Sequence, residues 1–216
     1  PLRVPGPMKV VSLNFWGIEP PLDRRLDLAI RQLKTLDPDV VCLQEVQPMA
    51  TGGTTADAIA QGLGMHAHYA RACTWDDGDW GPGSKAGEQG LAIVSRVPLA
   101  DHRVLELPEP RKGDVRILLS GRVGDIWVHT THLHYRLDDG VARERQVVAL
   151  DAAIRALGRT PGDAPQILCG DFNATPDADE IRFLRGLTTL DGRRTHFQDA
   201  WLRLHREPGP GDGPGQ

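Results

Sequence analysis

The sequence predicts a mixed-sheet α/β domain within its 216 residues. Short apolar runs of strand length alternate with segments of helical periodicity, as in α/β folds. Two later runs follow each other across a tight turn, which indicates that hairpins are present as well. We assign residues 8–205 to the domain, residues 1–7 to an upstream tail or cloning remnant, and the Gly/Pro-rich residues 206–216 to a flexible loop or tail.

The N-terminal part predicts two strands joined by a helix. Residues 8–15 (MKVVSLNF) form an apolar run that ends at the polar Asn14. Apolar residues then recur at helical spacing between residues 22 and 36, and Pro38 ends this amphipathic helix. Residues 39–46 (DVVCLQEV) are almost continuously apolar, which is typical of a strand buried on both faces, and Glu45 lies at its exit.

The middle of the chain predicts a helix over residues 54–63 and strands over residues 67–72 and 91–95. The segment 74–88 between these strands is rich in Gly, Asp and Trp and is therefore expected to be a loop. Its Trp75 and Trp80 are weak candidates for substrate contact, by stacking on a base, sugar or lipid head group. The ordinary alternative is that both are partly buried loop anchors.

The remaining strands are expected at residues 104–107, 115–123, 125–132 and 166–169. The pair that meets at Gly124 is expected to form a hairpin, and its second strand ends in a histidine-rich stretch, His129, His132 and His134. The longest helical signal covers residues 141–157, a short helix is expected at residues 181–187, and a further apolar segment covers residues 197–204.

Composition limits the classes of function. A formal charge of −4 and a pI near 6.1 argue against bulk electrostatic binding to nucleic acid, although a local basic rim is not excluded. No stretch approaches the roughly twenty apolar residues of a membrane span, and the N-terminus lacks the features of a secretory signal. Cys42 and Cys169 sit inside apolar strands, which favours a reducing compartment. We expect a cytoplasmic monomer without a transmembrane segment.

Polar side chains follow several of the predicted strands. Asn14, Glu45, His132 and the pair Asp171 and Asn173 all lie at strand exits. Each alone has an ordinary explanation as a turn residue, a solvated strand end or a core histidine. If the alternation of the strand continues past Gly170, Asp171 and Asn173 point to the same side.

Together these residues form a set of hard donors. Carboxylate and amide oxygens suit Mg²⁺, with Mn²⁺ as the alternative, because such ions take one or two carboxylates and keep several waters. The sequence has no HExxH and no CxxC pair, so a zinc site is unsupported. It also lacks a Walker-type glycine loop and a GxSxG motif.

An ordered series of motifs runs from about Lys9 to Trp201: SLNFWG, LQEV, GEQGLAIVSR, THLHY, GDFNATPD and FQDAW. In this order they resemble the endonuclease/exonuclease/phosphatase superfamily of Mg²⁺-dependent phosphoesterases, which includes deoxyribonuclease, abasic-site endonucleases and neutral sphingomyelinases. The resemblance implies a four-layer αββα sandwich, in which two mixed β-sheets are flanked by helices and the active site lies at the sheet rims.

The resemblance also implies roles for individual residues. Glu45 would be the principal metal ligand, with Asn14 beside it. Asp171 would orient or deprotonate the attacking water, and Asn173 would donate to a phosphoryl oxygen. His132 would face the phosphate as well.

Two further acids have less certain roles. Glu88 would support His132, since family members pair that histidine with an upstream acid. Asp199 would either support the site or only fix the final helix.

The sequence departs from the family pattern at its C-terminus. Family members continue past the FQDAW-like segment to a closing Ser-Asp-His, whose histidine is usually assigned as general acid or base, whereas this sequence stops at Gln216. We expect that the natural reading frame continues.

Two functions therefore remain as hypotheses. The first is a Mg²⁺-dependent hydrolase of phosphodiesters or phosphomonoesters, with nucleic acid among its candidate substrates. The second is a catalytically impaired module that binds a phosphate ligand.

Overall fold

The computed structural model describes residues 8–79, 84–158 and 165–205. The two predicted tails and Trp80 lie outside the described residues. In chain order the elements are β1 (Val10–Asn14), α1 (Leu22–Leu36), β2 (Val40–Val46), α2 (Thr55–Leu63), β3 (His66–Trp75), β4 (Gly87–Ser95), β5 (Asp101–Glu106), β6 (Ile117–Val123), β7 (Ile126–His132), α3 (Gly140–Leu157), β8 (Gln166–Asp171), α4 (Asp179–Leu184) and α5 (Ala200–Leu204).

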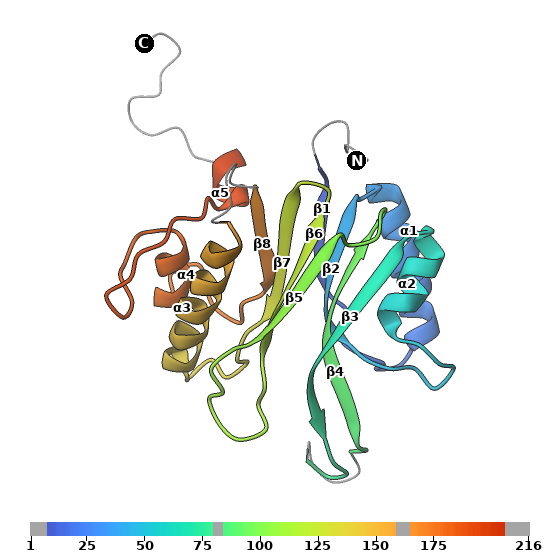
Figure 1. Cartoon of the computed structure of the whole chain (residues 1–216). Helices are drawn as coiled ribbons and strands as arrows, with labels where there is room; N and C mark the ends of the chain where they lie inside the picture. The colour runs from blue at the N-terminus through green and yellow to red at the C-terminus, as the bar shows by residue number, and fades with distance from the viewer. Residues whose placement is uncertain (1–7, 80–83, 159–164, 206–216) are drawn as a thin grey trace.

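The strands form two mixed sheets that face each other. The first has the order β1-β2-β4-β3 and the second β5-β6-β7-β8. In each sheet one outer pair is parallel, β1 with β2 and β7 with β8, and the other pairs are antiparallel. Helices α1 and α2 cover the outer face of the first sheet, and α3 and α4 cover that of the second (Figure 1). The predicted four-layer αββα sandwich is thus confirmed.

Strand β2 shows why its sequence is apolar at nearly every position. Val41 and Leu43 pack in the core beneath α1 and α2, whereas Val40 and Cys42 pack in the core between the two sheets. Alternate residues of a strand face opposite sides, so a central strand of a sandwich needs apolar side chains on both. A third core joins the second sheet to α3 and α4.

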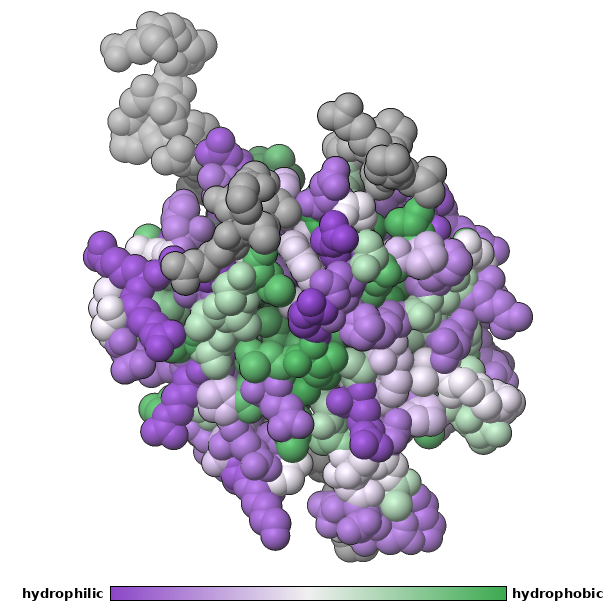
Figure 2. Space-filling view, in the orientation of Figure 1, coloured by the Kyte–Doolittle hydropathy of each residue, from purple (hydrophilic) through white to green (hydrophobic). Residues whose placement is uncertain are grey.

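The surface also separates hydrophobic from hydrophilic residues. Figure 2 shows hydrophobic residues gathered near the middle of the face, where the strands of the two sheets come together, while the periphery is mainly hydrophilic. No helix in the described part of the chain is long and apolar enough to cross a membrane.

The helix boundaries follow local chemistry. Helix α1 ends at Asp37, whose backbone is left-handed (φ 50°) and whose N–H donates to Leu33 O, directly before Pro38. Helix α2 begins with a capping box between Thr54 and Asp57. These two boundaries agree with the sequence prediction.

The segment 74–88 corrects the prediction of a continuous loop. Strand β3 extends to Trp75 and β4 begins at Gly87, so both ends of the segment belong to one long hairpin. The Trp75 indole donates to Lys85 O at 2.8 Å across this hairpin. Cross-strand pairing therefore overrides the low strand propensity of the polar residues.

The later elements have shifted boundaries. Strand β5 starts at Asp101 rather than at 104, and α4 covers Asp179–Leu184 rather than 181–187. The apolar segment 197–204 forms helix α5 from Ala200 onward. Helix α4 stops early because Gly186, just beyond it, has a left-handed backbone (φ 77°) that a helix cannot continue through.

Candidate active site

The strand exits of the two parallel pairs meet at one rim of the sandwich. Asn14 is the last residue of β1 and lies in register with Gln44 of β2, next to Glu45. His132 and Asp171 end β7 and β8 and are in register with each other. Parallel strands place their carboxyl ends at the same edge, and β1 and β2 pack against β8.

The Asn14 amide joins the two sheets. Its Nδ2 donates to Glu45 Oε1 at 2.8 Å and to Asp171 Oδ2 at 3.0 Å, while its Oδ1 accepts from the backbone N–H of Trp16 at 3.0 Å. These three contacts fix which way the amide points. One neutral side chain thereby holds two carboxylates, one from each sheet, close together.

The backbone at Glu45 is irregular. Glu45 has a left-handed conformation (φ 55°), and the pairing of β2 with β4 shifts register between Leu43 and Val46. Such a conformation costs an ordinary residue about 1–2 kcal/mol. Residues held this way cluster at functional sites.

The preceding Gln44 is a buried tie between the sheets. Its side chain is 1% exposed and donates to Thr130 Oγ1 of β7 at 2.9 Å. This hydrogen bond anchors β2 to the second sheet at the residue directly before the strained Glu45. The sequence assigned no role to Gln44, although it shows a polar residue inside the otherwise apolar run of β2.

The corner after β8 depends on Gly170. Its φ is 148°, and a Cβ there would lie 2.2 Å from the backbone oxygen of Thr131. Only glycine lets β8 approach β7 so closely at this point.

The side chains beyond Gly170 form a turn rather than a continued strand. Asn173 is left-handed (φ 48°), its N–H donates to Asp171 Oδ1 at 3.0 Å, and its Nδ2 donates to Leu133 O at 3.1 Å. The alternation of β8 thus does not continue to Asn173, because the Asp171 carboxylate caps the turn. Both side chains nevertheless line the same hollow.

This hollow is open to solvent and has a volume of ≈ 550 Å³. Polar side chains from both sheets and from the C-terminal segment line it, among them Ser12, Asn14, Gln44, Asp171, Asn173 and Asp199. A phosphate ester with part of its alcohol group can be accommodated there.

His132 lies at the edge of this centre. Its Nε2 is 3.8 Å from Asp171 Oδ2. Burial lowers the pKa of His132 from its usual value, and the positive charge of Arg116 lowers it further. The nearby carboxylates of Asp171 and Glu45 raise this pKa, but each has a smaller effect. The imidazole is therefore neutral at pH 7.

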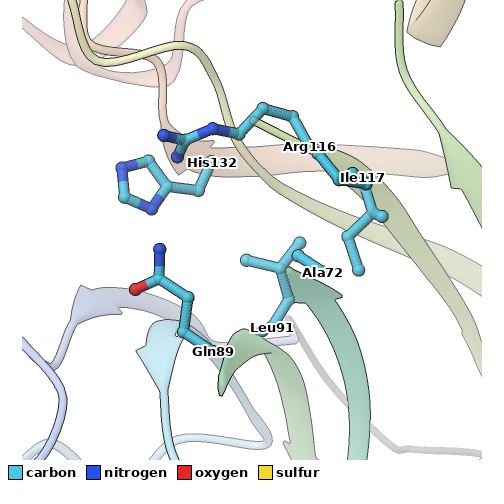
Figure 3. A pocket seen from close by; sticks show the side chains of 8 residues that line it. Ala72, Gln89, Leu91, Arg116, Ile117 and His132 are labelled. Carbon is cyan, nitrogen blue, oxygen red and sulfur yellow. The ribbon is translucent and has the colours of Figure 1, made fainter. Parts of the chain in front are cut away.

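Two neighbours of His132 were not found from the sequence. Figure 3 shows the Arg116 guanidinium beside the imidazole and the Gln89 amide pointing toward it. Arg116 is 5% exposed and is held by Asp114, with 2.8 Å between its Nε and Asp114 Oδ1. An arginine at the start of a predicted strand gives no signal that it will be buried beside a histidine.

The expected contact between Glu88 and His132 is not formed. Glu88 instead accepts from the Tyr69 hydroxyl at 3.1 Å and lies 3.5 Å from Arg71. Its neighbour Gln89 lines the gap beside His132, because adjacent strand residues face opposite sides.

Asp199 and Trp75 have local partners. Asp199 caps α5, accepting from the Leu202 N–H at 3.1 Å, and also lines the hollow. Trp75 packs over Gly87 in the hairpin, where a Cβ would lie 2.6 Å from its ring.

The donor set of the centre fits a hard cation. The carboxylates of Glu45 and Asp171 both contact the Asn14 amide. Among the described residues neither carboxylate forms an ion pair with a lysine or arginine, so their negative charge is left for a cation. Within the same residues, no group of three or more His, Cys, Asp or Glu side chains is placed to hold a metal ion. Mg²⁺ needs no such cage, since it is usually bound by one or two carboxylates and keeps several waters.

Comparison with known families identifies the class of protein. The model of the Endonuclease/Exonuclease/phosphatase family matches residues 11–215, and the chain belongs to this family. Protein angel of Drosophila melanogaster is 29% identical over an alignment of 182 residues that covers 76% of this chain and 47% of that protein. The chain thus spans about half the length of this relative.

Solved structures share the fold. The human nocturnin catalytic domain with bound sulfate superposes with a TM-score of 0.64 at 21% identity, covering 83% of this chain and 69% of that one. ANGEL2, described as a 2',3'-cyclic phosphatase and solved with adenosine-2',3'-vanadate, gives a TM-score of 0.58 at 23% identity, covering 83% and 57%.

Proposed function

We propose that the protein is a phosphoesterase that hydrolyses a phosphodiester or phosphomonoester by attack of water. The observation that carries this proposal is the Asn14 amide, which holds the Glu45 and Asp171 carboxylates together from opposite sheets. Membership of the endonuclease/exonuclease/phosphatase family supports the same reaction class.

Asp171 is the residue best placed to act on water. Its carboxylate is oriented from two sides, by the Asn14 amide at Oδ2 and by the Asn173 N–H at Oδ1. An oriented carboxylate at the edge of an open hollow can align a water molecule and accept its proton. General bases of this kind contribute about 10²–10⁴-fold to a rate.

Asn173 and His132 would contact the phosphoryl group. Asn173 Nδ2 uses one of its two hydrogens on Leu133 O and has a second for a phosphoryl oxygen. The neutral His132 imidazole lies beside Asp171, where it can donate to the same group. Donors fixed before the reaction stabilise the charge that develops on phosphoryl oxygens.

Glu45, with Asn14 beside it, would hold Mg²⁺ or Mn²⁺. When bound, the ion supplies neutralisation of phosphoryl negative charge and Lewis-acid polarisation. The positive φ of Glu45 supports this role, because strained backbone conformations of this kind cluster at functional sites.

The substrate we propose is a nucleotide-type phosphate ester. The ligand of the structural neighbour ANGEL2, adenosine-2',3'-vanadate, supports this class, as does the open hollow. Cys42, Cys73 and Cys169 are free thiols, which agrees with the proposed cytoplasmic location.

The test is hydrolysis of bis-p-nitrophenyl phosphate and of adenosine 2',3'-cyclic phosphate with Mg²⁺ and with EDTA. We expect Mg²⁺-dependent release of product that Glu45→Gln lowers by about 10²-fold or more. Binding of Mg²⁺ and phosphate without turnover would support the impaired binding module instead. A rate that ignores both EDTA and the substitution would contradict the proposed centre.

A further inference from the structure

A second group of charged side chains lies between β7 and α3, and the proposed reaction does not use it. His134, just beyond β7, is 1% exposed. Its Nδ1 lies 2.5 Å from Asp114 Oδ2. Its Nε2 is the only buried side-chain nitrogen or oxygen in the described part of the chain that lacks a hydrogen-bond partner.

The contact with Asp114 defines the role of each ring nitrogen. An ionised carboxylate only accepts hydrogen bonds, so Nδ1 donates to Asp114, and Nε2 is the ring nitrogen left to bind a metal ion. Asp114 is held in turn by Arg116 at 2.8 Å. A histidine whose other ring nitrogen donates to a carboxylate is the arrangement typical of metal-binding histidines.

Asp139 faces the free nitrogen. Its Oδ2 lies 3.6 Å from His134 Nε2, while its Oδ1 accepts from the Ala142 N–H at the start of α3. A separation of 3.6 Å is too long for a hydrogen bond. Two ligand atoms at about 2.0–2.2 Å from one tetrahedral ion are about 3.3–3.6 Å apart.

The surrounding charges leave Asp139 available. Arg136 pairs with Asp138, and Arg111 donates to the Tyr135 hydroxyl. Asp139 forms no ion pair with a lysine or arginine of the described residues. His134 and Asp139 are among the residues that line an open hollow of ≈ 360 Å³, from which water can complete a coordination shell.

We propose that His134 Nε2 and Asp139 Oδ2 bind a transition-metal ion with nitrogen and oxygen preference, for which Zn²⁺ is the probe. This site is separate from the centre at Glu45 and Asp171 and does not depend on the proposed reaction. A bound ion would fasten the segment that follows His132 to the first turn of α3. With two protein ligands, its other positions are taken by water.

The experiment is calorimetric titration of the whole protein with Zn²⁺ in saturating Mg²⁺, so that the Glu45 centre is already filled. We expect one Zn²⁺ per chain. At free Zn²⁺ about 100 times the dissociation constant, the Tm should rise by about 5 °C or more.

Two variants and a control make the assignment specific. Asp139→Asn keeps a good cap for α3 but removes the anionic ligand, and we expect affinity to fall at least about tenfold. His134→Gln should fall further. His66→Gln, at an exposed histidine of β3, should bind Zn²⁺ as the wild type does.

NMR gives a readout that is independent of these substitutions. The His134 Nε2 signal of ¹⁵N-labelled wild-type protein should move on addition of Zn²⁺, and the Nδ1 signal should keep its protonated position. Absence of Zn²⁺ binding by the wild type at millimolar concentration overturns the proposal. So does an affinity that Asp139→Asn leaves unchanged, since the ion would then lie elsewhere.

Discussion

The sandwich has a parallel half, made of β1 with β2 and β7 with β8, and an antiparallel half, and the two differ in how their strands end. Around β1, β2, β7 and β8 the parallel pairs deliver Asn14, Glu45, His132 and Asp171 to one rim. In the antiparallel half, β3 and β4 form a long hairpin whose polar side chains, such as Glu88, pair with their own strand neighbours. Polar residues at strand ends therefore indicate a site where parallel strands bring their ends together, and a turn where they do not.

The largest contrast should appear in the rate of hydrolysis. Asp171→Asn removes the proposed base at the parallel rim, and we expect a loss of about 10²–10⁴-fold in kcat/KM. Asp125→Asn, in the exposed turn between β6 and β7, changes the same functional group and should retain the wild-type rate. Steady-state assays on one phosphodiester compare both. Equal losses would remove the distinction between the two halves.

Two glycines extend the contrast to stability. Gly170→Ala places a Cβ 2.2 Å from the backbone of Thr131 and strains a positive φ, so we expect a loss of about 3–5 kcal/mol in the free energy of unfolding. Gly124→Ala, in the β6–β7 turn, meets no atom within 4 Å and should cost about 1 kcal/mol from its φ of 59° alone. Urea denaturation measures both losses, and a smaller loss for Gly170→Ala would show that β8 does not need its close approach to β7.

Strand β7 carries one histidine in the core, His129, and one at the rim, His132. His129 is fully buried and hydrogen-bonded to Ser120 and Gln166, and burial lowers its pKa to about 4. Below pH 6.5 the unfolded chain takes up a proton that native His129 does not. Stability attributable to His129 should therefore fall by about 3 kcal/mol as pH falls from 6.5 to 4.

The check is denaturation at pH 7 and pH 4.5 for the wild type and for His129→Gln. The substitution should reduce the loss of stability on acidification, even though it lowers stability at pH 7. The same loss in both proteins would show that other groups titrate.

The smallest effect concerns Asp199, which borders the rim and caps α5. Asp199→Ala should cost about 1 kcal/mol, whereas Asp199→Asn should keep the stability because asparagine caps equally well. Denaturation midpoints compare the two variants. An equal loss in both would mean that the charge of Asp199, rather than its cap, stabilises the segment.

The sequence predicted those helices and strands whose hydrophobic pattern depends on local periodicity or on burial of both faces. The continuous apolar run of β2 indicated a strand with a core on each side, and the spacing of α1 together with Pro38 indicated a helix and its end. The strand exits at Asn14, Glu45, His132 and Asp171 were visible as polar residues after apolar runs.

The remaining features depend on contacts between distant segments. The extension of β3 and β4 into the segment 74–88 comes from cross-strand pairing, which composition does not encode. Gln89 continues the alternation of Leu91 and Ile93 toward the core between the sheets, but only the packing of the second sheet shows that this position borders His132. Arg116 beside His132 is equally invisible, because its burial follows from Asp114 and from the packing of two sheets.

The central claim is that Glu45 and Asp171, from different sheets, form one centre through Asn14. A double-mutant cycle on Mg²⁺-dependent hydrolysis, with Glu45→Gln, Asp171→Asn and the double variant, tests it directly. Residues that act as a unit are strongly non-additive, so the double variant should be about as slow as the slower single variant. Losses in log kcat/KM that simply add would mean that the two carboxylates act independently and would contradict a single centre.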